Sequence, residues 1–158
     1  DYGWLWQDTE IADEMITRLD RLGLRVLQNE SVVCHGLQFA GVEDLWSPRF
    51  ELEKTLSGVD RNLPTVYLCH NPDGADQPGW EGHQGWILSG HTHGGQIKPP
   101  YLPPLVIPIK NKAYLKGEID LGGGRMLYVS RGLGHALHLR LNVRPEITVF
   151  TLKSNGCP

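Results

Sequence analysis

The sequence has no apolar run that approaches the roughly 20 residues needed for a bilayer-spanning helix. Its first residues also lack the pattern of a signal peptide. A disulfide framework is missing as well, because the three cysteines are an odd number and include no Cys-x-x-Cys pair. These absences predict no membrane span within the sequence and leave the compartment open.

An excess of basic residues is also absent. Lys and Arg number 15 against 18 Asp and Glu, which gives a formal net charge of -3. Nucleic-acid binders normally carry a basic patch or a basic balance, so we expect no nucleic acid duplex as partner. Small or lipid-borne phosphate esters fit better. With 158 residues, 40% of them hydrophobic, the chain can form a domain core, although it need not be a complete domain.

A turn that could bind metal follows the apolar run Trp86-Ile87-Leu88. It reads Gly-His-Thr-His-Gly-Gly-Gln and contains His91 and His93. A strand directs alternate side chains to opposite faces, but the flanking glycines free the backbone to turn, so both imidazoles can reach one site. Neutral imidazole suits zinc, iron, manganese or nickel. The pair alone is a weak signal.

A second strand end of the same kind lies upstream. The apolar run at residues 65–69 is typical of a strand covered on both faces, and His70 ends it. A single histidine at a strand end is more often a hydrogen-bonded structural residue than a ligand. Because a Gly-His-x-His turn follows the next strand, we favour the metal interpretation of His70.

Together these stretches resemble the calcineurin-like metallophosphoesterase superfamily. The His-Asn-Pro-Asp run from His70 and the extended Gly-His-Thr-His-Gly-Gly-Gln turn are similar to one branch, the bacterial phosphodiesterases that include membrane-associated UDP-diacylglucosamine pyrophosphatases. The Ser-Arg-Gly-Leu-Gly turn around Arg131 is also typical of that branch. The resemblance implies an α/β fold, a sandwich of two mixed sheets flanked by helices.

Part of the superfamily's motif pattern is absent from the sequence. The superfamily pattern opens with Asp-x-His, Gly-Asp-x-x-Asp and Gly-Asn-His followed by an acidic residue, and the sequence contains no such run. In this branch Asp-Tyr-Gly commonly follows Gly-Asn-His, and the sequence begins with Asp1-Tyr2-Gly3. We therefore expect residues 1–158 to be the C-terminal half of one metallophosphoesterase catalytic domain, whose N-terminal half would be its partner.

The reaction implied by the resemblance is hydrolysis of a phosphoester or pyrophosphate bond at a dinuclear metal site. Two divalent ions (Mn, Zn, Fe or Ni) would activate water and clamp the phosphate oxygens. His70 and His91 would bind one ion and His93 the other. Asp1 would orient, through a hydrogen bond, the histidine that protonates the leaving group; the absent half would supply that histidine, a bridging aspartate and an asparagine ligand.

The resemblance further implies a phosphate-ester substrate, lipid-linked or nucleotide, and a bacterial location in the cytoplasm or peripheral at the cell membrane. We expect Lys98 or Arg131 near the metal-facing crevice, because a phosphate ester brings negative charge that two cations only partly neutralise. An arginine at a strand end is, however, more often a surface or structural partner. Lys98 opens the proline-rich segment 98–108, which could cap the site or simply cover a sheet edge.

Two alternatives to a hydrolase remain open. A binding scaffold of the same fold would have lost metal ligands, and retention of all three histidines argues against it. A structural zinc site is closed by four protein ligands, and no fourth Cys or His is well placed. The other histidines are interpreted as non-ligands: His35 in a hairpin, His83 in an exposed loop, and His135 and His138 in a segment rich in arginine.

Hydrophobic periodicity and turn residues predict the order of elements. An amphipathic helix is expected from Thr9 or Glu10 to Leu22, with its apolar face in the core, and a short helix from Pro48 to Gly58. Strands are expected at residues 25–28, 31–35, 37–42, 65–69, 86–88, 113–119, 125–129 and 146–152.

Overall fold

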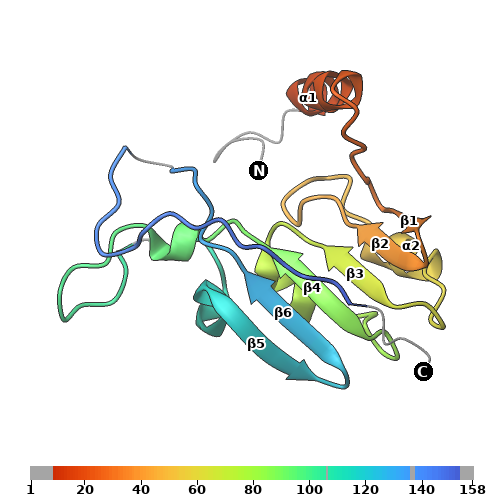
Figure 1. The fold of residues 1–158 in the computed structure, drawn as a ribbon. Coiled ribbons are helices and arrows are strands. Elements are labelled where there is room, and N and C mark those ends of the chain that lie inside the picture. Colours follow the sequence, from red (N-terminus) through yellow and green to blue (C-terminus); the bar gives the residue numbers. More distant parts are fainter. Residues whose placement is uncertain (1–8, 106, 136–137, 154–158) are drawn as a thin grey trace.

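The computed structural model describes residues 9–105, 107–135 and 138–153, which build one six-stranded mixed sheet (Figure 1). The strand order is β1-β2-β3-β4-β6-β5; β2, β3, β4 and β6 are parallel, and β1 and β5 pair antiparallel at the edges. This confirms the α/β class; the second sheet of the expected sandwich remains a prediction. With η for a short 3-10 helix, the elements are α1 (Thr9–Arg21), β1 (Glu30–Cys34), β2 (Leu37–Gly41), α2 (Leu52–Ser57), β3 (Thr65–Leu68), η1 (Pro72–Asp76), β4 (Gly85–Ser89), η2 (His93–Gly95), η3 (Lys112–Leu115), β5 (Gly117–Gly122) and β6 (Arg125–Val129).

One face of the sheet forms the core. Side chains alternate along a strand, so Tyr67, Ile87 and Leu127 of neighbouring strands share this face, and each is at most 1% exposed. They pack against apolar residues of α2, η1, η3 and the connecting loops, which are Leu52, Leu56, Ala75, Trp80, Ile109 and Tyr114. Burial of these side chains fixes the positions of the parallel strands and of the strand ends that follow them.

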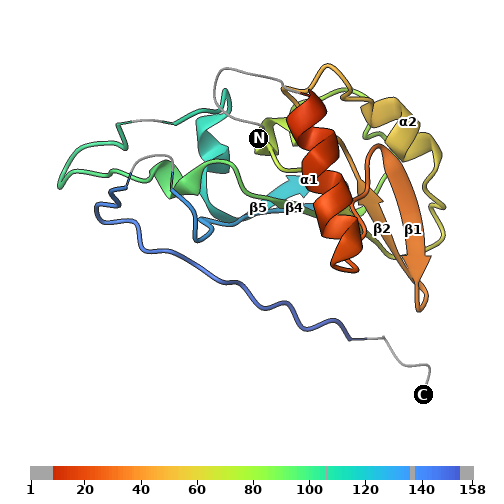
Figure 2. The same ribbon diagram turned by 90° about the horizontal axis from the view of Figure 1, so that it is seen from above.

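The opposite face of the sheet, the open face, is equally apolar but only partly covered. In register across the strands it presents Phe39, Val66, Trp86 and Met126, followed one pleat on by Leu68, Leu88 and Tyr128. Residues 143–153 run across it without joining a ladder (Figures 1 and 2). A strand that is apolar on both sides is typical of a sheet covered on both faces, so the sequence of these strands favours a further layer here.

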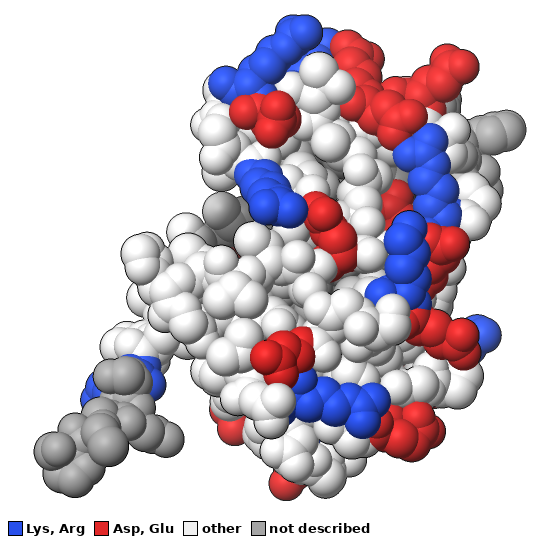
Figure 3. All heavy atoms as spheres, turned by 90° about the vertical axis from the view of Figure 1, so that its right-hand side faces the viewer, with Lys and Arg blue, Asp and Glu red and all other residues white. Residues whose placement is uncertain are grey.

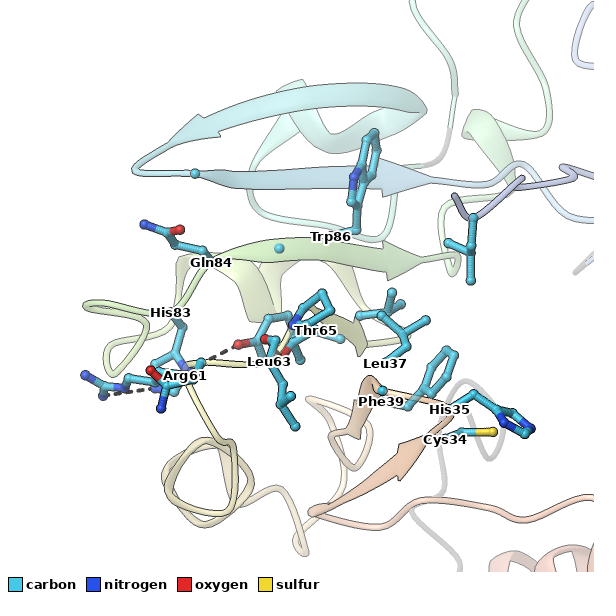
Figure 4. Close-up of a pocket in the computed structure, with 18 of the residues that line it drawn as sticks. Cys34, His35, Leu37, Phe39, Arg61, Leu63, Thr65, His83, Gln84 and Trp86 are labelled. Carbon is cyan, nitrogen blue, oxygen red and sulfur yellow. Dashed lines mark hydrogen bonds between the residues drawn. The ribbon is translucent and has the colours of Figure 1, made fainter. Parts of the chain in front are cut away.

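A groove of about 1020 Å³ lies on the open face (Figure 4). Leu37, Phe39 and Trp86 form its floor, and Leu152 and Lys153 contribute from the C-terminal segment. None of the three predicted metal ligands lines this groove. It is therefore a feature of the uncovered sheet rather than the place where the predicted chemistry would occur.

Two predicted strands are wrong. Residues 25–28 form no strand, and residues 146–152 are extended but have no ladder partner among the described residues. Ile147 and Val149 of the second segment are 75% and 84% exposed. The alternating pattern was present, but a strand exists only where another backbone accepts and donates its hydrogen bonds.

Two element starts also differ from the prediction. The helix expected from Pro48 begins at Leu52, because Ser47 closes a turn in which its carbonyl and hydroxyl accept from the amides of Phe50 and Arg49. The strand expected from residue 113 begins at Gly117, because the Asn111 side chain accepts from the Ala113 amide and caps η3 instead. In both cases a polar side chain accepts a hydrogen bond from a nearby backbone amide, and the regular element begins later than predicted.

Helix α1 forms as predicted, but the expectation that its apolar face lies in the core is wrong. Ala12 is buried, whereas Ile11 is 57% and Met15 is 44% exposed. Ile16 and Leu19 are half-buried, and an ion pair of Asp13 with Arg49 at 2.6 Å joins the helix to the loop before α2. Of the described helices, none combines the length and apolarity that spanning a bilayer requires.

Charged side chains of both signs are interspersed over the side of the molecule shown in Figure 3, and no basic patch is visible there. Described ion pairs such as Lys54 with Glu51 join opposite charges on the surface. Exposed pairs of this kind contribute little stability, about 0–1 kcal/mol each.

His83 is a correction to the sequence interpretation, because it is 3% exposed rather than a surface loop residue. Its Nε2 lies 3.2 Å from an Arg61 guanidinium nitrogen, and its Nδ1 lies 3.2 Å from the Tyr67 hydroxyl (Figure 4). Since Arg61 can only donate, Nε2 must accept and the proton sits on Nδ1. Burial, followed by the positive charge of Arg61, lowers the pKa of His83.

This network predicts a pH dependence of stability. The folded state takes up the His83 proton less readily than the unfolded chain, whose imidazole has a pKa of about 6.5. The contribution of His83 is therefore present above about pH 6.5 and is lost as the pH falls toward the folded-state pKa. Urea unfolding from pH 7.5 to 5 should show a steeper loss for the unmodified chain than for His83→Gln, which can still accept from Arg61. Equal pH dependence of the two would contradict the assignment.

Candidate metal centre

The predicted site lies at one edge of the sheet. The parallel strands β2, β3, β4 and β6 all end there, and the residues that follow them are Asp44, His70, His91 and Arg131. Backbone hydrogen bonds continue past the strands, from the Gly90 amide to the His70 carbonyl at 3.0 Å. Side chains that follow neighbouring parallel strands converge at the carboxyl edge of a sheet, so this edge is a natural place for a ligand.

His70 and His91 are brought together as expected. Their ring centroids lie 5.4 Å apart and the rings are nearly perpendicular, at 87°. The turn between β4 and η2 places His91 at φ 67°, a left-handed conformation that a residue other than glycine adopts only when its surroundings enforce it. The two imidazoles are therefore adjacent, from separate strand ends, as a shared ion would require.

Hydrogen bonds assign the nitrogens of His91. Its Nε2 lies 3.0 Å from the carbonyl oxygen of Pro108, which can only accept, so Nε2 carries the proton and Nδ1 carries the lone pair. The Trp46 ring lies edge-on to this imidazole, with centroids 4.5 Å apart. The lone pair on Nδ1 is the form that a metal ion binds, and an N–H bonded to a carbonyl is the usual way in which a ligand histidine is oriented.

His93 is held by the loop that follows β6. Its Nδ1 lies 3.1 Å from the Gly134 carbonyl oxygen, so Nδ1 donates and Nε2 carries the lone pair. The adjacent Gly94 adopts φ 63°, and a Cβ there would lie 2.7 Å from Cγ of Arg131. Only glycine allows the turn to approach the 131–134 loop this closely.

Burial lowers the pKa of His70, His91 and His93. For His70 this reflects atoms crowded around its ring, although the residue as a whole stays exposed at the sheet edge. All three imidazoles are therefore neutral at pH 7, which is the ligand form. Within the described residues, however, no three His, Cys, Asp or Glu side chains converge tightly enough to hold one ion by themselves.

Arg140 is a residue of the site that sequence analysis treated as part of a non-ligand segment. Its guanidinium donates to the carbonyls of Arg131, Gly132 and Gly134, and weakly to that of His93 at 3.4 Å. The Arg140 side chain thus ties the 131–134 loop to the metal turn. No periodic pattern in the sequence could reveal it, because its partners are backbone carbonyls of a loop.

Asp44 and Trp46 also lie at the site, although the sequence did not predict them as site residues. Asp44 is 9% exposed, and its negative charge opposes the lowering of the pKa of both His70 and His91, which places it near the two rings. Asp44 accepts from the Trp46 amide at 2.8 Å, which fixes the turn that brings the Trp46 ring to His91. The strand-end rule that identified His70 points to the same edge after β2, but Asp44 lies three residues beyond that strand, whereas His70 lies two residues beyond β3.

Asp73 orients the loop that follows His70 through backbone hydrogen bonds. Its carboxylate accepts from the amides of Lys110 and Asn111, and its own amide donates to the Asn71 side chain. These bonds join the loop after β3 to the segment that carries the Pro108 carbonyl. Asp73 thereby holds the partner of His91 in place.

The two residues predicted to contact phosphate, Arg131 and Lys98, lie in different surroundings. Arg131 lies against the metal turn, but its guanidinium is ion-paired with Glu146, which also accepts from the Tyr128 hydroxyl. Lys98 is exposed beyond the turn, and its backbone pairs with Leu141. Asp1 lies outside the described residues. The roles of all three stay predictions.

Comparison with known proteins finds relatives named as a metallophosphoesterase, a phosphodiesterase and a pyrophosphatase. The chain is 42% identical over 125 residues to the uncharacterized metallophosphoesterase YkuE of Bacillus subtilis, matching 76% of this chain and 42% of that protein. It is 35% identical over 142 residues to phosphodiesterase YaeI of Escherichia coli, with 85% and 49% covered. It is 30% identical over 149 residues to the UDP-2,3-diacylglucosamine pyrophosphatase LpxG of Chlamydia muridarum, with 86% and 44% covered.

The chain spans about half the length of the curated relatives it matches. No family model matches the sequence. No solved structure matches it either.

Proposed function

Because the chain belongs to the metallophosphoesterase family, we propose that it takes part in hydrolysis of a phosphoester or pyrophosphate bond by two divalent metal ions. The observation that carries the proposal is the convergence of His70 and His91 at the carboxyl edge of the sheet, with centroids 5.4 Å apart. The donor set fits such ions, since all three imidazoles are neutral and the hydrogen bonds of His91 and His93 leave one nitrogen lone pair on each ring.

In this proposal His70 and His91, through Nδ1 of the latter, would hold one ion, and His93 would hold the other through Nε2. The ions would supply a nucleophilic water at neutral pH and would polarise the phosphate. The chain's own residues orient the ligands: Pro108 accepts from His91, Gly134 accepts from His93, and Arg140 fastens the loop that carries Gly134. Asp44 supplies negative charge beside the first pair.

We further propose that the chain is one half of the catalytic domain and that the other half supplies the remaining ligands. Its span of about half the relatives' length supports this, as do the open face and the exposed apolar side of α1. We call the chain together with the residues encoded upstream of Asp1 the extended protein. In it a second sheet would cover the open face, and Asp1 would orient the histidine that protonates the leaving group.

Two relatives are named for a phosphodiesterase and for a UDP-2,3-diacylglucosamine pyrophosphatase. We propose a substrate of the same chemistry, a phosphodiester or pyrophosphate on a lipid or a nucleotide. Lys98 is the better candidate for a phosphate contact, because the charge of Arg131 is already balanced by Glu146. The alternative, a scaffold without catalysis, would have no need for three neutral imidazoles at one sheet edge.

The proposal is tested by assaying the extended protein on bis-4-nitrophenyl phosphate with manganese or zinc. Chelation should abolish turnover, and re-addition of the ion should restore it. Turnover that survives complete removal of metal, or a metal-loaded and folded protein that cleaves neither phosphodiesters nor pyrophosphates, would refute the function.

A further inference from the structure

Glu146 is a half-buried carboxylate in the segment that follows β6, and only 16% of its side chain is exposed. Its Oε2 accepts from the Arg131 guanidinium, and its Oε1 accepts from the hydroxyls of Tyr128 and Thr148. Its backbone amide donates to the Gly132 carbonyl at 3.0 Å. Both carboxylate oxygens are therefore bonded, to β6, to the loop after β6 and to the segment that carries Glu146.

The loop that Glu146 bonds is the one that holds His93. The Gly134 carbonyl of this loop accepts from Nδ1 of His93 at 3.1 Å. The Arg131 side chain gives a second connection, because a Cβ at Gly94, the neighbour of His93, would lie only 2.7 Å from Cγ of Arg131. Glu146 is thus linked to His93 through the backbone of the loop and through the apolar stem of Arg131.

Glu146 also places negative charge beside two guanidinium groups. Burial, followed by the charge of Arg131, lowers the pKa of Arg140, so the two arginines lie near each other against the same loop. After burial, the charge of Arg140 is also among the causes that lower the pKa of His93. A cation at His93 would be repelled by both guanidiniums. Hydrogen bonds, that of Tyr128 first, lower the pKa of Glu146, which is therefore ionised at pH 7 and offsets the charge of Arg131.

We infer, on the basis of the proposed function, that Glu146 is a positioning residue for the second ion: it fixes the loop that orients His93 and offsets the charge of Arg131 there. In this role Glu146 acts through His93 and makes no bond to the ion. The alternative is a purely structural role, in which Glu146 only fastens the C-terminal segment to β6. The contacts favour positioning, because Arg131 and Gly132, two partners of Glu146, belong to the loop that orients His93.

The test is titration of the metal-free extended protein and of its Glu146→Gln variant with manganese in a calorimeter. Glutamine has the same shape and can still accept from Tyr128, but it carries no charge to pair with Arg131. We expect the affinity for one ion to fall by about 10- to 100-fold, as is typical when a partner that orients a metal ligand is changed, while the other ion binds as before. Glu146→Gln added to His93→Ala should weaken binding no further than His93→Ala alone, because both changes act on the same ion.

The matched control is Glu51→Gln, the same change in the ion pair with Lys54 at the start of α2, and it should leave both affinities unchanged. Urea unfolding of the metal-free variants measures stability separately. A Glu146→Gln variant that is less stable but binds both ions as before would have lost only a structural contact, and equal weakening of both ions would remove the link to His93. Either result overturns the inference while two-ion binding and turnover by the unmodified protein leave the proposed function intact. An unmodified protein that binds no metal would refute both.

Discussion

Replacing His91 by alanine in the extended protein is expected to lower phosphodiester hydrolysis by more than about 100-fold, because loss of a residue that merely orients a ligand already costs roughly 10- to 100-fold. The substitution removes the nitrogen that shares an ion with His70 and also the N–H that bonds the Pro108 carbonyl. Bound metal, measured by plasma mass spectrometry, should fall from two ions per chain toward one.

The matched control for this experiment is His35→Asn. His35 occupies the turn of the β1–β2 hairpin at φ 50°, a conformation that asparagine tolerates, and it lies at the opposite end of β2 from Asp44. Its turnover and metal content should match those of the unmodified protein. Retention of activity by a folded His91→Ala variant would remove His91 from the site.

The second large effect concerns the chain alone. Residues 1–158 are expected to bind divalent metal weakly and to hydrolyse essentially nothing, because three imidazoles divided between two ions leave each with one or two ligands and no bridging carboxylate. Among described residues no group of three ligands exists to compensate. The general acid that the other half would supply in this proposal typically contributes about 10²- to 10⁴-fold by itself. The uncovered open face should also make the chain poorly soluble.

This prediction is measured by adding manganese or zinc to the chain and to the extended protein and following release of nitrophenol from the same phosphodiester. The same pair of proteins gives bound metal per chain by equilibrium dialysis. Comparable turnover by the two would show that the ligands come from within this chain and that the half-domain proposal is mistaken.

The parts of the fold that the sequence predicted are those that local pattern determines. The run at residues 65–69 and the run before His91 became β3 and β4, since Gly and Pro bound each run and apolar residues fill it. The segment 146–152 has the same alternation but needs a partner strand that the described chain does not offer. The apolar face of α1 likewise lacks a full covering layer among the described residues, and the half-domain proposal assigns that layer to the other half.

In the candidate site, too, some residues follow from a pattern in the sequence and others depend on distant partners. His70 and His91 follow parallel strands, so the topology of the sheet brings them together once the strands are recognised. Asp44 also lies beyond the end of a parallel strand, but it is three residues from β2, and the sequence predicted that the residues after it start a helix at Pro48. Arg140 and the burial of His83 depend on loop conformations and on Tyr67 from another strand, and no short-range pattern contains that information.

The measurement that tests the central claim most directly is anomalous X-ray diffraction from crystals of the extended protein grown with zinc. Two peaks about 3.5–4 Å apart are predicted at the carboxyl edge of the sheet. One should lie about 2.0–2.1 Å from nitrogens of His70 and His91, and the other at that distance from Nε2 of His93. Zinc bound instead by the adjacent pair His135 and His138, with no peak at the three strand-end histidines, would contradict the account.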